Sequence, residues 1–243
     1  MPNLLILGGT TEANALVKSV AEQGIPATYS YAGRVDSPRP QPVPTRVGGF
    51  GGAEGLARYI REHGISHIVD ATHPFAAQMS SNAVEACITT ATPLAALTRP
   101  AWVAQQGDDW QHVSDIEGAV DALSGPARRV FLAVGRMHLL DFAAQPQHHY
   151  LLRLVDEPET VPLPNRDILV SRGPFTVEDD RALMLRHGTQ LVVSKNAGGT
   201  GARAKLDAAR ALGLPVLMID RPVMPQRTEL TNVAQVLDWL AHT

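Results

Sequence analysis

The first segment whose residue types suggest chemistry is a turn rich in glycine and threonine near the start of the chain. It directly follows the apolar run Asn3–Leu7 and consists of Gly8, Gly9, Thr10, Thr11 and Glu12. Glycines let a ligand approach the backbone closely, and a helix that begins here would offer free N–H groups to a phosphate. Thr10 stands where the dinucleotide-binding pattern G-x-G-x-x-G has its second glycine, so an ordinary strand–helix turn with a threonine cap explains these residues equally well.

The second candidate lies at the end of the next apolar run, Ala27–Tyr31. Folds that bind NAD usually carry Asp or Glu at this point to hold the ribose 2′-hydroxyl. No acidic residue occurs between Thr28 and Arg34, and Ser30 and Arg34 are available instead. Because a guanidinium pairs well with a phosphate, the pattern favours NADPH, with a surface arginine on a loop as the alternative.

A histidine that precedes a proline follows a later apolar run. His73 lies two residues after Ile68–Ala71, at the strand end where open α/β sheets bind ligands. Pro74 restricts His73 to an extended conformation, which can direct the ring into a cleft. The imidazole could then act as a general acid or a polar anchor, and a structural His-Pro turn is the alternative.

Arginines recur directly after predicted strands, a position that suggests carboxylate binding. They are Arg99, Arg136, Arg172 and Arg221. One arginine of this kind is most often a solvated surface group, but four at strand ends indicate a cleft that receives carboxylates. Lys195 belongs to a similar turn, Ser194–Gly201, whose glycines and lysine could cradle an anion although the turn is not a Walker A sequence.

Other classes of protein are disfavoured by what the chain lacks. The single cysteine, Cys87, cannot form an internal disulfide or a multi-cysteine metal site, and no set of His, Asp and Glu has metal-like spacing, so no metal is expected. A net charge of −3 argues against nucleic acid binding. The apolar opening run is too short for a signal peptide or a membrane span, which predicts a soluble, cytoplasmic protein.

Short apolar runs alternate with helix-forming stretches along the chain, which predicts an α/β fold with mostly parallel sheets. The predicted strands are Asn3–Leu7, Ala27–Tyr31, Ile68–Ala71, Leu94–Leu97, Val130–Val134, Tyr150–Val155, Ile168–Val170, Leu191–Ser194 and Pro215–Ile219. The predicted helices are Thr11–Gln23, Ala53–His63, Ala76–Thr90, Val177–Arg186, Gly201–Leu212 and Val233–Ala241. Ser37–Thr45 contains four prolines and is expected to be irregular.

The length of 243 residues suits two small domains or one large one. The segment Leu123–Pro126 is the best candidate for a junction. It would divide the chain into a dinucleotide-binding domain, residues 1–124, and a domain that contributes to a substrate cleft, residues 125–243. The first half has an acidic excess and the second a small basic excess, so the second half could favour an anionic ligand.

Taken in order, these motifs resemble the precorrin-6A reductase family of cobalamin biosynthesis. The matching segments are Ile6–Ala13, Tyr31–Arg34, Gly48–Gly52, Asp70–Ala76, Thr98–Trp102, Gly135-Arg136, Ser171–Phe175, Ser194–Gly199, Lys205 and Arg221-Pro222. The resemblance implies two Rossmann-like α/β domains with an interdomain cleft. It also implies that NADPH reduces one ring double bond of an anionic tetrapyrrole, giving precorrin-6B.

The resemblance implies roles for individual residues as well. The residues expected to bind the cofactor are Gly8, Gly9, Thr10, Thr11, Glu12, Ser30, Arg34, Gly49, Phe50, Gly51 and Thr72. Those expected to bind substrate carboxylates are Arg99, Arg136, Arg172, Lys195 and Arg221. His73 and Lys195 are the candidate proton donors, with solvent or the substrate itself as the alternative. The oligomeric state stays open, with a monomer as the working expectation.

Three other functions remain open at this point. The closest is reduction of the cobalt-containing substrate of the anaerobic pathway with NADH. A short-chain sugar or ketone reductase would need a Tyr-x-x-x-Lys pair, which none of the tyrosines provides. A nicotinamide-sensing regulator would need a partner surface or a DNA-binding module, and no segment is left over for one.

Overall fold

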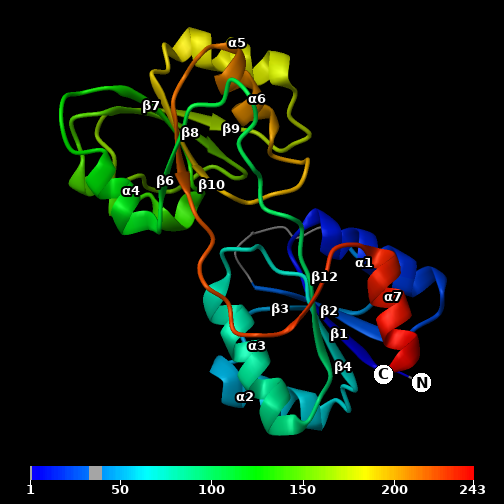
Figure 1. Ribbon diagram of the computed structural model, residues 1–243. Coiled ribbons are helices and arrows are strands. Elements are labelled where there is room, and N and C mark those ends of the chain that lie inside the picture. Colours follow the sequence, from blue (N-terminus) through cyan, green and yellow to red (C-terminus); the bar gives the residue numbers. More distant parts are fainter. Residues whose placement is uncertain (1, 33–39) are drawn as a thin grey trace. The chain divides into compact units, whose positions relative to one another are not determined.

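The computed structural model describes residues 2–32 and 40–243, and the chain forms two compact units (Figure 1). Unit 1 combines Met1–Pro100 with Val223–Thr243, and unit 2 is Ala101–Pro222. Each unit is built on one six-stranded sheet in which every strand pair is parallel. Parallel sheets need helical crossovers, so this topology explains the alternation of strands and helices along the chain.

The sheet of unit 1 has the strand order β12-β5-β4-β1-β2-β3. Its strands are β1 (Leu4–Leu7), β2 (Ala27–Tyr31), β3 (Thr45–Val47), β4 (His67–Asp70), β5 (Leu94–Leu97) and β12 (Thr228–Leu230). Its helices are α1 (Thr11–Glu22), α2 (Gly52–Glu62), α3 (Ala77–Thr90) and α7 (Val233–His242). The strand order reverses between β1 and β4, and this switch point is where open α/β sheets bind ligands.

The central strand β1 shows how the sequence produces this layered packing. Successive side chains of a strand point to opposite faces of the sheet. Leu4 and Ile6 pack in one apolar cluster with residues of α1 and α7, whereas Leu5 and Leu7 pack in another with residues of α2 and α3. Both faces of β1 are therefore covered, and a strand buried on both faces is uniformly apolar rather than alternating.

The sheet of unit 2 has the strand order β6-β11-β10-β7-β8-β9. Its strands are β6 (Trp110–Val113), β7 (Arg129–Ala133), β8 (His149–Leu154), β9 (Arg166–Val170), β10 (Leu191–Lys195) and β11 (Val216–Ile219). Its helices are α4 (Ile116–Ala122), α5 (Val177–His187) and α6 (Ala204–Ala211), with the short 3₁₀ turns η1 (Arg136–His138) and η2 (Asp141–Ala144). In the described part of the chain, no helix is both long and apolar enough to cross a membrane.

The α/β prediction is confirmed, whereas the observed division of the chain differs from the expected junction near Gly125. The segment before that glycine contributes β6, which pairs with β11 and so belongs to unit 2. The last strand, β12, pairs with β5 and so returns the C-terminal residues to unit 1. Both strands lie at sheet edges and are too short and polar to be recognised in the sequence. The interdomain cleft stays a prediction.

Candidate functional site

The carboxyl edge of the unit 1 sheet gathers the residues that were expected to bind a cofactor. Leu7, the last residue of β1, pairs in register with Ser30 of β2 on one side and with Asp70 of β4 on the other. Because all of these strands are parallel, the segments that follow them leave the sheet at the same edge. The glycine turn after β1 and the segment after β4 therefore flank the switch point, which is the usual ligand position in this topology.

Tyr29 holds the glycine turn in place. Its hydroxyl accepts a hydrogen bond from the Gly9 N–H at 2.9 Å and donates one to Asn14 Oδ1 at 3.1 Å. A Cβ at Gly8 would lie 2.1 Å from the Tyr29 ring, so Gly8 is required for this packing. Burial raises the pKa of Tyr29 to about 12, and the hydroxyl therefore keeps the proton with which it binds Asn14.

The backbone of the turn is accessible at Gly9. This residue has a φ of 116°, and no heavy atom apart from its chain neighbours lies within 4 Å of the place where a Cβ would stand. Thr10 caps α1, since its Oγ1 accepts a hydrogen bond from the Ala13 N–H at 3.1 Å and donates one to Ala71 O at 2.8 Å. An open glycine backbone at a capped helix N-terminus fits the pyrophosphate of a dinucleotide.

The helix that begins at Thr11 carries a carboxylate in its first turn, and Arg99 neutralises it. Arg99 Nη1 lies 2.5 Å from Glu12 Oε2, and both side chains are partly buried. An unpaired carboxylate here would repel a bound phosphate, so the ion pair makes the turn more suitable for an anion. The sequence predicted Arg99 as a substrate ligand; in the structure its guanidinium lies beside the glycine turn, and the substrate role stays a prediction.

Arg46 on β3 is a functional candidate that the sequence reasoning missed. Its guanidinium donates hydrogen bonds to Ser30 Oγ and to Gly48 O, both at 2.8 Å, and to Gly49 O at 3.0 Å. The same group stacks on the Phe50 ring, 3.8 Å from its centroid. Arg46 thus connects two of the predicted cofactor segments. Arg34, the predicted phosphate ligand, lies outside the described residues.

In the loop between β3 and α2, an aromatic ring is packed against the helix while the glycine backbone is open. Phe50 packs edge-on against Tyr59 of α2, with the ring centroids 5.2 Å apart. Gly51, the residue just before α2, has a left-handed conformation with a φ of 83°. No heavy atom beyond the chain neighbours lies within 4 Å of a Cβ built at Gly49 or Gly51, so this loop leaves room for a ligand next to its backbone.

Asp70 organises the segment after β4. Its Oδ1 accepts hydrogen bonds from the Thr72 hydroxyl at 2.6 Å and the Thr72 N–H at 3.1 Å. Its Oδ2 accepts from Ser80 Oγ and from Arg227 Nη1, both at 2.6 Å. The side chains of Asp70 and Arg227 are 1% and 7% exposed. A buried, fully paired carboxylate therefore fixes the backbone on which Thr72 and His73 stand.

His73 is exposed and oriented by its own segment. Its Nδ1 accepts a hydrogen bond of 3.2 Å from the Phe75 N–H, and its ring lies 5.8 Å from the Phe75 ring. A nitrogen that accepts a hydrogen bond carries no proton, so the neutral ring is protonated at Nε2. This tautomer suits His73 as a hydrogen-bond donor, because full protonation of the ring would break the bond from Phe75.

In unit 2 the predicted anion ligands also stand at the carboxyl edge of the sheet. Lys195 ends β10, next to Ile219 at the end of β11. Arg221 donates hydrogen bonds to Asn196 O at 2.9 Å and to Ala197 O at 3.1 Å, so it shapes the backbone after Lys195. Trp102 supports the same loop through its indole N–H, which donates to Gly199 O at 2.6 Å.

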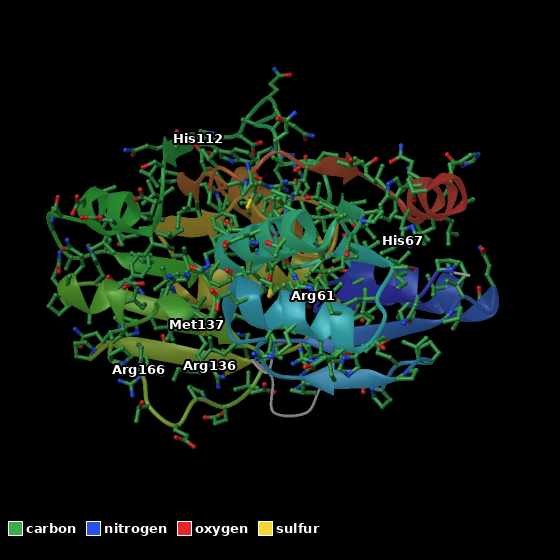
Figure 2. All side chains as sticks on the ribbon, turned by 90° about the horizontal axis from the view of Figure 1, so that it is seen from below. Arg61, His67, His112, Arg136, Met137 and Arg166 are labelled. Carbon is green, nitrogen blue, oxygen red and sulfur yellow. The ribbon has the colours of Figure 1, made fainter. Side chains whose placement is uncertain are left out.

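Two other predicted ligands occupy separate turns of unit 2. Arg136 is an exposed residue of η1, beside the exposed Met137 (Figure 2). Arg172 is half-exposed and pairs with Asp156, with 2.5 Å between Nη2 and Oδ1. The sequence reasoning missed Arg153, which forms a buried ion pair with Asp180 and stacks on Phe175, 3.7 Å from the ring centroid. Arg153 thereby braces the segment next to Arg172.

Comparison with known proteins gives a consistent result over the whole chain. Residues 3–241 match the family model described as Precorrin-6x reductase CbiJ/CobK. The chain is 56% identical to a protein of Rhodobacter capsulatus named Precorrin-6A reductase, a match that covers 99% of this chain and 96% of the relative. It is 31% identical to a protein of Priestia megaterium named Cobalt-precorrin-6A reductase, which covers 98% of each chain.

A solved structure agrees with the sequence comparison. The structure titled CobK precorrin-6A reductase has a TM-score of 0.95 and 56% sequence identity to this chain. The match covers 100% of this chain and 97% of that one. The fold is therefore shared along the full length.

Proposed function

The chain belongs to the Precorrin-6x reductase CbiJ/CobK family, and we propose from this premise that it reduces precorrin-6A with NADPH. The observation that supports this function best is the convergence of three segments at one edge of the unit 1 sheet. The segments are the open glycine turn at Gly9, the pair of Ser30 and Arg46, and the Thr72–His73 segment that Asp70 fixes.

We assign the parts of the cofactor to these segments by their chemistry. The turn from Gly8 to Glu12 holds the pyrophosphate through its backbone N–H groups and the α1 N-terminus. Ser30 and Arg34 hold the ribose 2′-phosphate, and Arg46 adds a second guanidinium beside Ser30. Gly49, Phe50, Gly51 and Thr72 border the nicotinamide end. When bound, NADPH supplies a hydride to a ring carbon of the tetrapyrrole.

The cations of unit 2 are proposed to bind the acidic side chains of the macrocycle. Lys195 ends a strand of the unit 2 sheet, and Arg136, Arg172 and Arg221 follow the ends of three others. A guanidinium binds a carboxylate in two parallel hydrogen bonds, which fixes both position and orientation. Arg99 is the weakest candidate for a substrate ligand, because its guanidinium forms an ion pair with Glu12.

The reduction also needs a proton for the conjugated system of the substrate. His73 and Lys195 are the proposed donors. In this role His73 would act as the imidazolium, which gives up the bond that Nδ1 accepts from the Phe75 N–H and becomes neutral again when it releases its proton. The remaining protein groups act by orientation and electrostatics, because the cofactor carries the chemistry of hydride transfer.

Anaerobic incubation of the protein with precorrin-6A and NADPH tests the proposal. We expect the tetrapyrrole to gain two hydrogen atoms, seen by mass spectrometry, together with a change in its absorbance. Parallel reactions with NADH and with cobalt-precorrin-6A test the cofactor and the metal content of the substrate. If neither precorrin-6A nor cobalt-precorrin-6A gained two hydrogen atoms, the proposed activity would be contradicted. We further propose that the protein is cytoplasmic, which cell fractionation tests. We also propose that it is a monomer, which the molecular mass measured by analytical ultracentrifugation tests.

A further inference from the structure

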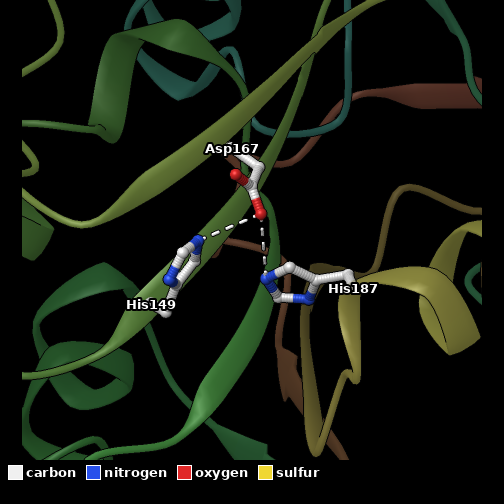
Figure 3. A group of neighbouring side chains, drawn as sticks. All are labelled: His149, Asp167 and His187. Atoms are coloured by element: carbon white, nitrogen blue, oxygen red, sulfur yellow. Dashed lines mark hydrogen bonds and ion pairs between the residues drawn. The ribbon is translucent and has the colours of Figure 1, made fainter.

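We propose that His149, Asp167 and His187 form a binding site in unit 2 for a divalent transition-metal ion such as Zn²⁺. The residues come from the start of β8, from β9 and from the end of α5. Their candidate ligand atoms all lie within 4.8 Å of one another (Figure 3). They are distant in the sequence, which is why no metal-like spacing was visible there.

His187 carries the argument furthest, because its ring is buried and aimed at the other two residues. The side chain is 2% exposed, and Nε2 has no hydrogen-bond partner among the described residues. The other nitrogen, Nδ1, is hydrogen-bonded to Thr189 Oγ1 at 2.9 Å, which fixes the ring so that Nε2 lies 3.9 Å from Asp167 Oδ2. Buried polar atoms are rarely left unpaired, and a metal ion would satisfy this one.

The distances suit a tetrahedral ion. His149 Nε2 lies 3.0 Å from Asp167 Oδ2, and His187 Nε2 lies 3.9 Å from the same oxygen. Ligands about 2.0–2.2 Å from a tetrahedral zinc ion stand roughly 3.3–3.6 Å from one another. The two observed separations lie on either side of this range, and a bound ion would replace the hydrogen bond between His149 and Asp167. Two imidazoles and one carboxylate are the donor set of a borderline metal rather than of Mg²⁺ or Ca²⁺.

The position in the sheet separates this cluster from the proposed reductase site. His149 opens β8 and pairs in register with Arg129 at the start of β7, so the cluster lies near the amino edge of the unit 2 sheet. Lys195 ends its strand at the opposite, carboxyl edge. A metal ion here would join the edge strand β9 to the end of α5. Since Asp167 is 54% exposed, water can take a further coordination position.

Arg129 is the cation with which a metal ion must compete. Its Nη2 lies 3.8 Å from Asp167 Oδ2, and its Nε donates a hydrogen bond to His187 O. A guanidinium at this distance repels a divalent ion and already neutralises the carboxylate in part. Replacement of Arg129 by a neutral residue should therefore strengthen metal binding, whereas a simple surface ion pair between Arg129 and Asp167 predicts no such effect.

Calorimetric titration of the untagged, chelator-treated full-length protein with Zn²⁺ tests the site, with Mg²⁺ as the comparison ion. We expect one Zn²⁺ to bind per chain, and His149→Gln and Asp167→Asn each to weaken binding by about tenfold or more. Arg129→Gln should tighten it. The matched control is His112→Gln, because His112 pairs with Asp220 at 2.7 Å and is exposed (Figure 2).

The Zn²⁺ affinities of the variants decide whether the site exists. Zn²⁺ affinity that is lost in both ligand variants but kept in His112→Gln supports the site, as does a rise in melting temperature with Zn²⁺ that Mg²⁺ does not cause. Equal Zn²⁺ affinity in the wild type and in both ligand variants overturns it, and so does the absence of binding in the wild type. Folding of each variant is checked by circular dichroism. Because binding is read without any turnover, failure of this site leaves the proposed reductase activity untouched.

Discussion

Arg46 and Ser30 are register partners on the neighbouring strands β3 and β2, and the Arg46 guanidinium donates a hydrogen bond of 2.8 Å to the Ser30 hydroxyl. This relationship supplies a cation at the strand end where a ribose phosphate would bind. It also ties the glycine loop to the sheet, since Arg46 donates to Gly48 O and Gly49 O.

Removal of the Arg46 charge should weaken NADPH binding. We expect Arg46→Gln to raise the KM for NADPH by about tenfold, since charge-assisted hydrogen bonds contribute roughly 1.5–3 kcal/mol. Arg34→Ala should raise the KM for NADPH far more than that for NADH. The control is Arg58→Gln, an exposed arginine of α2. Steady-state kinetics with both cofactors measure these values, and equal effects of Arg34→Ala on both would contradict the assignment to the 2′-phosphate.

Alanine at Gly8 and at Gly49 should have different consequences. A Cβ at Gly8 would collide with the Tyr29 ring, whereas one at Gly49 meets open space. We therefore expect Gly8→Ala to lower the melting temperature clearly and Gly49→Ala to leave it nearly unchanged. If a cofactor lies next to the loop, Gly49→Ala still raises the KM for NADPH. An unchanged KM would place the nicotinamide elsewhere.

The Asp70 network should be important for stability. Asp70→Asn leaves the buried Arg227 with only the half-exposed Glu229 as a charge partner, and breaking a buried pair in this way costs about 3 kcal/mol of unfolding free energy. Urea denaturation measures the loss. Asp238→Asn removes a carboxylate that is 78% exposed and should change stability by less than about 0.5 kcal/mol. Similar small effects of both substitutions would show that the network contributes little.

The two proposed proton donors can be separated by kinetics. A variant that lacks the essential donor should have a kcat lower by about a hundredfold, because general acid catalysis contributes at least that much. We expect this result for His73→Ala or for Lys195→Ala. A residue that only binds a substrate carboxylate should instead raise the KM for the tetrapyrrole. Near-normal kcat in both variants would assign the proton to solvent or to the substrate.

Cys87 should react slowly and with an unusual pH dependence. Burial, with a further contribution from the Asp70 charge, raises the pKa of this thiol to about 12. Below that value the thiolate fraction grows about tenfold per pH unit, so the alkylation rate of the native protein should still rise between pH 8 and pH 10. In the urea-unfolded protein the rate should level off near the ordinary thiol pKa of about 8.5. A native rate that levels off at the same pH would contradict the shift.

Some strands could be predicted from the sequence and others could not. β1 was predictable because it is buried on both faces and is therefore uniformly apolar. β3 was missed because four closely spaced prolines precede it and its outer side chains are exposed. Arg46 was missed with it, since its role depends on the pairing of β3 with β2. Had a strand been recognised just before the Gly48–Gly52 turn, Arg46 would have been identified as a residue at the strand end.

Contacts between residues far apart in the sequence were equally invisible. The ion pair of Arg99 with Glu12 and that of Arg227 with Asp70 form only when the sheet of unit 1 is complete. The cluster of His149, Asp167 and His187 depends in the same way on the placement of β8, β9 and α5. Local patterns describe strands and turns, but not which side chains those elements bring together.

The return of β12 to the first sheet imposes an order on the synthesis of the chain. Unit 2 is one continuous segment, so all of its strands are synthesised before the final strand and α7 of unit 1. Arg227 follows unit 2 in the sequence, so the Asp70 carboxylate has no Arg227 partner until unit 2 has been synthesised. The unit that begins first is therefore completed last, and a chain truncated before Val223 would retain the glycine turn on an unfinished scaffold.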